Sequence, residues 1–319
     1  MQRANRLQRQ RGVAVITALL LTTLAITIVA SLFWQQQVQV RSIENQRLQL
    51  QTKWILRGAL DWARLILRED KKFSSVDHTG EPWAVPLAET RLDEYVEKNS
   101  ARADTTDAAL SGGIVDAQSR FNLTNLCANA VINPEQVAVF ERLLALLRLN
   151  PALASATAEV MAAAQQRTAT GAAGSAGADA GAAAPLGLTH QEDLLAVPGF
   201  TPEIVDSLKE YVVVLPRLTS ININTAPAEV LAARIETLSI SDATTLVASR
   251  ETAYFRNLGD FEQKLPQGSL PSGTRSGLDV STSYFIVHGN VRLDRASQEM
   301  RSLIERSGNS TKVIWIRNH

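Results

Sequence analysis

An uninterrupted apolar run, residues 13–34, stands directly behind a short basic leader, and it constrains this chain more than any other feature. The run contains no charged residue, no Gly and no Pro. As a helix rising about 1.5 Å per residue it spans roughly 33 Å, enough to cross the hydrocarbon core of a membrane. Gly12 lies before the run, whereas a secretory signal has its small-residue cleavage site behind it. Cleavage at Gly12 would remove only the leader and keep the apolar helix.

The leader, residues 1–12, carries four arginines and no acidic residue. Positive charge before a membrane span favours the cytoplasmic side, so everything after Trp34 is expected across the membrane. The apolar run alone leaves a plain single-pass anchor as an open alternative. A cleaved secretory signal fits less well, since its apolar region is typically about 7–15 residues long.

The helix is expected to continue well beyond the span. Residues 35–68 contain one glycine, Gly58, and no proline, and they consist mostly of good helix formers. We therefore predict one continuous helix of about 55 residues, whose second half packs on a globular domain. The apolar stripe expected to make that contact consists of Ile55, Ala59, Trp62, Ala63 and Ile66.

Charge and motif content disfavour catalysis and nucleic-acid binding. Lys plus Arg and Asp plus Glu are both 32, and loss of the four leader arginines leaves a formal charge of −4. That balance is unlike a nucleic-acid-binding protein. The four histidines are scattered and no H-E-x-x-H or G-x-S-x-G motif occurs, so we expect surface or capping histidines and no enzyme. The single cysteine, Cys127, excludes an intrachain disulfide and is predicted to be a small buried residue.

The middle of the chain predicts a β-hairpin followed by helices. The hairpin is expected in SGGIVDAQSRFNLTNL, with Gly112 and Gly113 introducing its first strand. Asn133, followed by Pro134, marks a helix start. Residues 171–184 are Gly or Ala at 12 of 14 positions, and we predict a flexible surface loop over 168–187.

Further helix signals follow that loop. A capping box pairs Thr189 with Glu192, and Thr201 opens a helix expected to reach about Val214. Other helices are expected near Thr225 and over 241–250, with a short turn of helix over 259–265. Residues 126–277 therefore form a predicted all-helical domain.

The C-terminus changes to the two-residue period of strands. Three antiparallel strands are expected over 283–293, 299–306 and 311–317, with a hairpin turn at 307–310. The predicted fold class is α+β: a long N-terminal helix on a split antiparallel sheet, with a helical insertion. The domains are a cleaved leader 1–12, a helix 13–70 with its span at 13–34, a core of 71–125 and 278–319, and the insert 126–277.

The leader and helix resemble the N-termini of type IV pilins and pseudopilins. That resemblance implies cleavage by a prepilin peptidase between Gly12 and Val13 and methylation of Val13. The fifth mature position, usually Glu, is Thr17, which cannot form an ion pair with a neighbour's N-terminal amine. A subunit at a filament tip needs no such pair. Partner helices are expected to contact faces that carry hydroxyl side chains, namely Thr17, Thr22, Thr23, Thr27 and Ser31.

Four segments together resemble the minor pseudopilin K family of type II secretion systems over nearly the whole chain. They are RQRGVAVIT, DAQSRFNLTNL, ININTAPAEVLAA and the strands SYFIVHGNVRL, SLIERS and KVIWIR. The resemblance implies an inner-membrane anchor in a Gram-negative bacterium, a cytoplasmic N-terminus and a periplasmic body. Implied partners are minor pseudopilins I and J at the pseudopilus tip and the major pseudopilin. Some family members bind calcium, but this sequence has no EF-hand loop and we assign no ligands.

One competing interpretation is a membrane-anchored protein that binds DNA during uptake. ININTAPAEVL and the helix after it are similar to helix-hairpin-helix (SAM-like) modules, which hold phosphate at a two-glycine hairpin before a helix N-terminus. No glycine occurs between residues 231 and 247, and the segment around Gly199 has only one. Residues 190–265 hold 6 basic and 11 acidic side chains, which would repel a phosphate backbone.

Overall fold

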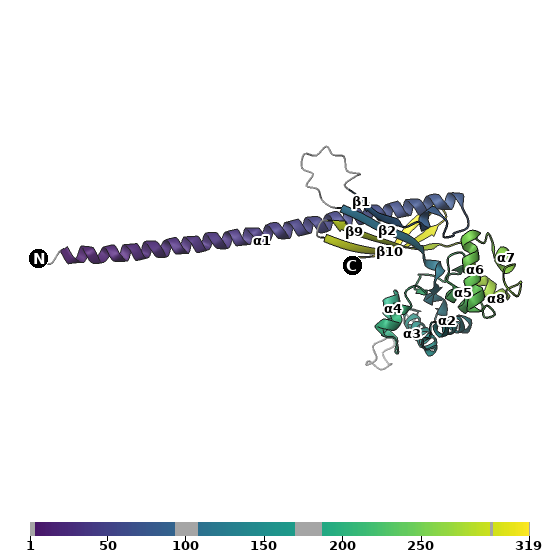
Figure 1. Ribbon diagram of the computed structural model, residues 1–319. Coiled ribbons are helices and arrows are strands. Elements are labelled where there is room, and N and C mark those ends of the chain that lie inside the picture. Colours follow the sequence, from purple (N-terminus) through teal and green to yellow (C-terminus); the bar gives the residue numbers. More distant parts are fainter. Residues whose placement is uncertain (1–3, 93–107, 170–186, 294–295, 319) are drawn as a thin grey trace.

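The N-terminal helix dominates the shape of the molecule (Figure 1). The computed structural model describes residues 4–92, 108–169, 187–293 and 296–318. Helix α1 runs unbroken over Ala4–Phe73, 70 residues, and confirms the predicted continuous helix. The Gly/Ala loop predicted over 168–187 lies, for residues 170–186, outside the described residues, while 168 and 169 belong to a helix.

The second half of α1 packs on the sheet through a stripe that only partly coincides with the predicted one, sharing Ala63 with it. Its buried residues recur every three or four positions: Thr52, Leu56, Leu60, Ala63 and Leu67. Trp62 is 64% exposed, and Ile55 and Ile66 lie at the margin of the contact. The helix carries apolar side chains on two faces, and only the leucine face meets the sheet.

A five-stranded sheet lies beside α1, in the order β1-β2-β9-β10-β11, and every neighbouring pair is antiparallel. Strands β1 (Leu87–Arg91) and β2 (Ala108–Asp116) precede the insertion, and the other three follow it. The three C-terminal strands are confirmed as β9 (Tyr284–Leu293), β10 (Ala296–Ser307) and β11 (Ser310–Asn318). The sheet is therefore split, as predicted.

The two faces of this sheet have different coverings, because successive side chains of a strand point to opposite faces. On β9, Phe285, Val287 and Val291 pack with Leu56 and Leu60 of α1. The alternate residues Tyr284 and Ile286 pack on the other face with Val213 and Leu215 of the insertion. The sheet thus lies between α1 and the insertion.

The predicted hairpin over residues 111–126 is wrong. Gly112 and Gly113 lie inside β2, which pairs with β9, and Phe121–Asn122 (β3) pairs in parallel with Val212–Val213 (β6). Gly112 serves a close contact between strands instead of a turn. A Cβ atom on Gly112 would lie 2.3 Å from the carbonyl oxygen of His288.

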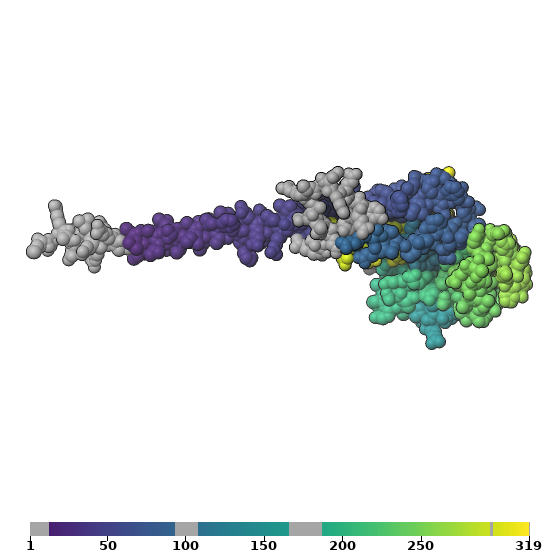
Figure 2. Space-filling model, turned by 45° about the horizontal axis from the view of Figure 1, so that its top comes forward, coloured from purple at the N-terminus to yellow at the C-terminus, as the bar shows by residue number. Residues whose placement is uncertain are grey.

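Short helices build the insertion, seen below the sheet in Figure 1 and as the green lobe in Figure 2. Its α-helices are α2 (Pro134–Leu146), α3 (Ala152–Ala169), α4 (Pro202–Ser207), α5 (Ala228–Arg234), α6 (Ile240–Thr252), α7 (Leu258–Glu262) and α8 (Ser272–Ser276). The 3-10 helices of the chain are Pro82–Ala84, Ala117–Ser119, Leu123–Leu126 and Gln191–Ala196. The remaining short strands are β4 (Cys127–Ala128), β5 (Val131–Ile132), β7 (Ile221–Asn222) and β8 (Leu278–Asp279).

Some of the predicted helix boundaries are correct and others are shifted. The Asn133 side chain accepts hydrogen bonds from the backbone N–H groups of Glu135 and Gln136, which confirms it as the N-cap of α2. The helix after Thr201 ends at Ser207, short of Val214, because 212–213 pairs with β3.

The helices predicted over 241–250 and 259–265 are present as α6 and α7, whereas two other predicted starts are shifted. The capping box over 189–192 falls one residue later, where the Asp193 carboxylate accepts from the backbone N–H of His190 and opens a 3-10 helix. The ININ segment begins with strand β7, so the helix expected near Thr225 starts at Ala228. The domain boundaries given above stay a prediction.

The insertion has its own apolar core, in which Phe121 and Phe140 stack with ring centroids 5.4 Å apart. Cys127 belongs to this core and is 1% exposed, which confirms it as a buried residue. Its Sγ lies 3.4 Å from Oε1 of Gln165, and burial raises the pKa of the thiol. It is therefore an inert core thiol.

Exchange of Gly112 for Ala should destabilise the sheet, whereas the same exchange at Gly113 should not. The new methyl group at 112 meets the backbone of β9, but at 113 its nearest neighbours are atoms of Pro86 at 3.8 Å. We expect Gly112→Ala to lower the free energy of unfolding by about 1–3 kcal/mol. Urea unfolding of the full chain in detergent micelles measures this. Equal stability of the two variants would contradict the close approach.

Candidate assembly interface

Residues 13–34 of α1 are apolar and make no contact with the rest of the described chain. Within the described residues α1 is the one helix long and apolar enough to cross a membrane. None of its most apolar stretch is buried. The exposed fraction is 62% for Val13 and 71% for Trp34 at its two ends. Figure 2 shows this apolar part of α1 as a bare rod that projects from the globular part of the chain, which we call the head. Such a surface requires lipid or other helices around it.

The predicted processing and assembly residues lie along this rod. Gly12 and Val13 are consecutive residues of α1, and the Thr17 hydroxyl donates to the carbonyl oxygens of Val13 and Ala14 at 3.1 and 3.0 Å. The hydroxyls of Thr22, Thr23 and Thr27 bond to preceding carbonyls in the same way. These hydroxyls are therefore satisfied within the helix and can enter lipid without a partner.

A buried ion-pair network fixes the end of α1 to the sheet. Arg306 of β10 is 3% exposed, and its guanidinium bonds to Asp70 at 2.9 Å and to Asp77. The same guanidinium donates to the carbonyl oxygen of Thr282 at 3.1 Å and lies 4.6 Å from the centre of the Phe285 ring. One side chain thus connects α1, the loop behind it and two strands.

A second buried network fixes the ININT segment to the sheet. Asp116, at the end of β2 and 2% exposed, accepts from Asn222 Nδ2 at 2.9 Å and from the Thr225 hydroxyl at 2.6 Å. Asn222 also donates to the carbonyl oxygen of Asp77 at 3.0 Å, which joins the two networks. Burial raises the pKa of Asp116 to about 6, against the hydrogen bonds that favour its charged form.

Asn122 of the DAQSRFNLTNL motif and Asn224 of the ININT segment form hydrogen bonds with buried backbone groups outside regular helices and strands. The Asn122 Oδ1 accepts from the backbone N–H of Leu215 at 3.0 Å, and its Nδ2 donates to the carbonyl oxygen of Arg217 at 2.7 Å. Asn224 forms the corresponding pair of bonds with the backbone of Phe255. These asparagines satisfy irregular buried backbone, so their role in the motif is structural.

The calcium implied by resemblance can be tested against one carboxylate cluster in the described part of the chain. One group of three carboxylates, Asp70, Asp77 and Glu81, has ligand atoms within 4.8 Å of one another. The guanidinium of Arg306 already occupies the space between two of them. Glu81 accepts from the indole N–H of Trp83 at 2.8 Å. This group is an internal ion-pair cluster and does not fit a resident cation.

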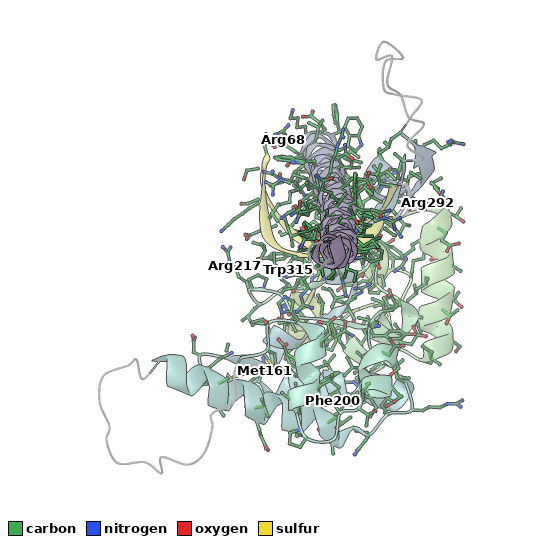
Figure 3. All side chains as sticks on the ribbon, turned by 90° about the vertical axis from the view of Figure 1, so that its left-hand side faces the viewer. Arg68, Met161, Phe200, Arg217, Arg292 and Trp315 are labelled. Atoms are coloured by element: carbon green, nitrogen blue, oxygen red, sulfur yellow. The ribbon has the colours of Figure 1, made fainter. Side chains whose placement is uncertain are left out.

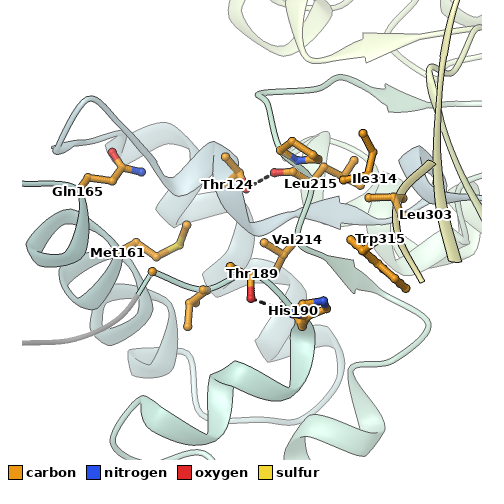
Figure 4. Close-up of a pocket in the computed structure, with 13 residues that line it drawn as sticks. Thr124, Met161, Gln165, Thr189, His190, Val214, Leu215, Leu303, Ile314 and Trp315 are labelled. Atoms are coloured by element: carbon orange, nitrogen blue, oxygen red, sulfur yellow. Dashed lines mark hydrogen bonds between the residues drawn. The ribbon is translucent and has the colours of Figure 1, made fainter. Parts of the chain in front are cut away.

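A cavity of about 410 Å³ lies between the insertion and the sheet (Figure 4). Its walls are mostly apolar, with Met161 and Leu215 from the insertion facing Leu303 and Trp315 from the sheet. Figure 3, viewed along α1, shows Met161 in the insertion, away from α1, and Trp315 nearer to α1. His190 lies at the rim, 5.3 Å from the Trp315 ring, and desolvation lowers its pKa.

The remaining histidines also lack the surroundings of a catalytic base. His78 stacks on Tyr254 with ring centroids 3.9 Å apart. His288 is half-buried on the sheet, where desolvation lowers its pKa, and His319 lies outside the described residues. None of the three described histidines bonds to a Ser, Cys or Asp side chain arranged as a nucleophile and its base; the 2.7 Å contact of His190 with Thr189 caps a helix.

The structure also disfavours a phosphate-binding hairpin. Gly199, with φ of +96°, turns the chain between two short helices, and α4 behind it has six residues. The link between α5 and α6 contains no glycine. Combined with the excess of acidic residues in this region, these features disfavour the DNA-binding alternative.

The geometry defines a pilin-like subunit: an exposed apolar helix that continues onto an antiparallel sheet, enlarged by a helical insertion. Two family models described as type II secretion system (T2SS), protein K match residues 119–217 and 221–281, together half of the chain. The chain belongs to this family of minor pseudopilins, as its sequence resemblance indicated.

Relatives and a solved structure extend the likeness over nearly the whole length. The chain is 29% identical to type II secretion system protein K of Pseudomonas aeruginosa, over 93% of this chain and 89% of that protein. It is 26% identical to the protein K of Pectobacterium carotovorum, over 96% and 95% of the two chains. A chain in the crystal structure of the GspK-GspI-GspJ complex from enterotoxigenic Escherichia coli shares the fold, with a TM-score of 0.65, 21% identity, and coverage of 88% and 99%.

Sequence reasoning missed the residues that hold the head together. Arg306 ends the predicted strand 299–306 and Asp70 ends the predicted helix 13–70, but no predicted element covers Asp77 and no prediction joins the three residues. Their charge was visible, but their partners are more than 200 residues apart. The leucine stripe of α1 did carry a signal, the regular spacing of residues 52, 56, 60, 63 and 67.

Removal of Arg306 should destabilise the head far more than removal of a surface arginine. Arg306→Met leaves two carboxylates buried without a counter-charge, which costs about 3–5 kcal/mol. The control is Arg57→Met, because the Arg57 and Asp61 side chains are 52% and 53% exposed and their pair contributes less than about 1 kcal/mol. Urea unfolding of both full-length variants measures the difference. A similar loss in both would show that the network is not a major constraint.

Stability should depend on pH through Asp116. Its folded-state pKa of about 6 lies above 3.8, the ordinary pKa of an aspartate side chain, so folding favours the protonated carboxyl. The stabilisation is full below about pH 4 and is lost as the pH rises to about 6, a change of about 3 kcal/mol. Asp116→Asn cannot titrate.

Comparison of the unaltered chain with Asp116→Asn isolates the contribution of Asp116 to the pH dependence of stability. The free energy of unfolding of the unaltered chain should fall relative to Asp116→Asn between pH 4 and 6 and run parallel to it above pH 7. Parallel curves over the whole range would show that Asp116 is ionised normally in the fold.

Proposed function

We propose that this minor pseudopilin caps the tip of the periplasmic pseudopilus of a type II secretion system. In the proposal a prepilin peptidase cuts between Gly12 and Val13, Val13 is methylated, and the freed helix associates with the helices of other pseudopilins. The body would lie in the periplasm, anchored by one span in the inner membrane of a Gram-negative bacterium. The chain would act by assembly alone and catalyse no reaction.

The observation that carries the proposal is the combination of a bare apolar rod with an enlarged head. The rod supplies a surface for lateral packing with similar helices, where packing and polar matching decide association. The insertion widens the head at the end opposite the N-terminus (Figure 1). Thr17 supports a terminal position, because it offers no carboxylate to a subunit stacked above it.

Partners follow from the same arrangement. We propose minor pseudopilins I and J as tip partners, supported by the shared fold of a chain solved in a complex with GspI and GspJ. The major pseudopilin would follow below them. Recovery of all three minor subunits in one detergent-solubilised complex supports the proposal, and recovery of this chain alone from cells expressing all three contradicts it.

Replacement of Gly12 by Leu should block processing, because a bulky residue would not fit a peptidase that accepts glycine before the cut. The expected product is a precursor that keeps its 12-residue leader, seen by intact-mass measurement or N-terminal sequencing. The control Ala4→Leu alters the leader away from the cut and should yield a mature protein that begins at Val13. A variant at Gly12 that still begins at Val13 would contradict the assignment.

Introduction of a carboxylate at position 17 should leave secretion intact. Thr17→Glu restores the residue usual in stacked subunits, and a tip subunit has no upper neighbour that would respond to it. Secretion of an exported reporter enzyme, relative to the unaltered chain, measures the effect. Loss of secretion with normal processing would place this subunit inside the filament instead.

A further inference from the structure

A row of basic side chains crosses the face of the sheet that the insertion covers. The strand register places Arg301 of β10 beside His288 of β9 on one side and beside Arg317 of β11 on the other. Residues paired in this way present their side chains on the same face. Leu303, two residues after Arg301 and therefore on the same face, packs with Leu215 of the insertion. The row thus faces the insertion.

Arg120 adds a second guanidinium from the start of the insertion. It belongs to the DAQSRFNLTNL motif, precedes β3 directly and is 4% exposed. Its Nη2 donates to Oε2 of Glu210 at 2.8 Å. Desolvation lowers the pKa of the Arg301 guanidinium, and the nearby positive charge of Arg120 lowers it further. The two guanidiniums are therefore neighbours at the junction of insertion and sheet.

Each of these two guanidiniums has a buried nitrogen without a hydrogen-bond acceptor in the described part of the chain. The atoms are Nη1 of Arg120 and Nε of Arg301. An unpaired buried donor destabilises a fold, and a charged one does so more strongly. Such donors in native proteins call for an acceptor, either water or a ligand. Water accepts hydrogen bonds but does not offset the repulsion between two cations, whereas an anion does both.

The charge balance of the cluster indicates how much negative charge is missing. The groups that act most strongly on Arg301 are Arg120, Arg317, Glu192 and Glu210. Two ion pairs join these four groups, Arg317 with Glu192 at 2.7 Å and Arg120 with Glu210 at 2.8 Å. Arg301 is left as the cation without a carboxylate partner among the described residues. One negative charge would complete the cluster.

The cluster is open to solvent on one side. The Glu210 side chain is 78% exposed and that of Arg317 is 30% exposed, and Arg301 is partly exposed. The exposed Glu299, two residues before Arg301, acts on His288 and is not among the main groups that act on Arg301. A small anionic group can therefore reach Arg301 without displacement of the insertion.

We propose that Arg120 and Arg301 form a binding site for one carboxylate group. A guanidinium presents a planar set of donors that matches the two oxygens of a carboxylate, and one carboxylate carries the single charge that the cluster lacks. The carboxylate belongs either to a free organic acid or to an acidic side chain of another protein. Because one arginine lies at the start of the insertion and the other in the sheet, occupancy would hold these two parts together. The inference does not depend on the tip function.

Titration with acetate tests the site directly. The full chain, labelled with ¹⁵N-arginine in detergent micelles, is titrated with sodium acetate and separately with sodium chloride at equal ionic strength and constant pH. We expect the Nε–H resonance of Arg301, assigned by its absence in Arg301→Met, to shift with acetate and to saturate in the millimolar range. The shift should be lost in Arg120→Met. The matched control Arg292→Met removes an arginine of β9 that pairs with Glu89 at 3.0 Å, and it should leave the titration unchanged.

The stability of the unliganded chain separates a binding role from a structural one. Methionine keeps the apolar stem of Arg301 but removes its charge and its unpaired N–H group. In chloride, Arg301→Met should therefore not lower the thermal midpoint. Acetate should raise the midpoint of the unaltered chain above its value in chloride, and should raise that of Arg301→Met less. A midpoint that falls as far as in Arg306→Met would make Arg301 a structural residue and overturn the site.

A blocked glutamate distinguishes the two sources of the carboxylate. N-acetyl-glutamic acid α-amide presents only the side-chain carboxylate of a residue within a protein. If it binds at least as tightly as acetate, the site accepts a protein side chain; if acetate alone binds, the ligand is a free acid. An equal response of the unaltered chain and Arg301→Met to acetate, or binding of phosphate without binding of acetate, overturns the carboxylate site.

Discussion

The guanidinium of Arg306 is the constraint on which the head depends. It lies in a site with 3% exposure and holds two carboxylates from the end of α1 and the loop behind it. Burial of such a group is costly unless every charge has a partner. The end of a 70-residue helix is therefore fixed in one position on the sheet, and the rod that precedes it has a defined direction.

The second buried network fixes the position of the insertion relative to the sheet and the end of α1. Asn222 bonds to both the Asp77 carbonyl and the Asp116 carboxylate, so the ININT segment is attached where the sheet meets the end of α1. Buried polar networks of this kind specify one arrangement when all members are satisfied. The asparagines of the ININT segment, a motif typical of the family, thus attach the insertion to the sheet, and no ligand is needed to explain them.

Helix α1 divides its apolar residues between folding and assembly. The leucine face is covered by β9 and β10 within the chain, whereas the rod, Trp54 and Trp62 stay exposed. A monomer gains nothing from two exposed tryptophans on one helix face, but an oligomer built from parallel helices does.

The sequence by itself determined those features that depend on local order. The apolar run, the absence of helix breakers and the two-residue period of the C-terminal strands predicted α1, β9, β10 and β11, because helix and strand periodicity are properties of neighbouring residues. Cys127 and the Asn133 cap were also predictable. The split of the sheet followed from strands at both ends of the soluble part, and the family followed from its motifs.

Only the tertiary structure decided which residues meet across long distances in the chain. Gly112 and Gly113 looked like turn residues, yet the contact of β2 with β9 requires glycine at 112. The two apolar faces of α1 could not be told apart until the sheet covered one of them. Asp70, Asp77 and Arg306 carry no local signal of their pairing, since their contact depends on chain segments that only the completed fold brings together.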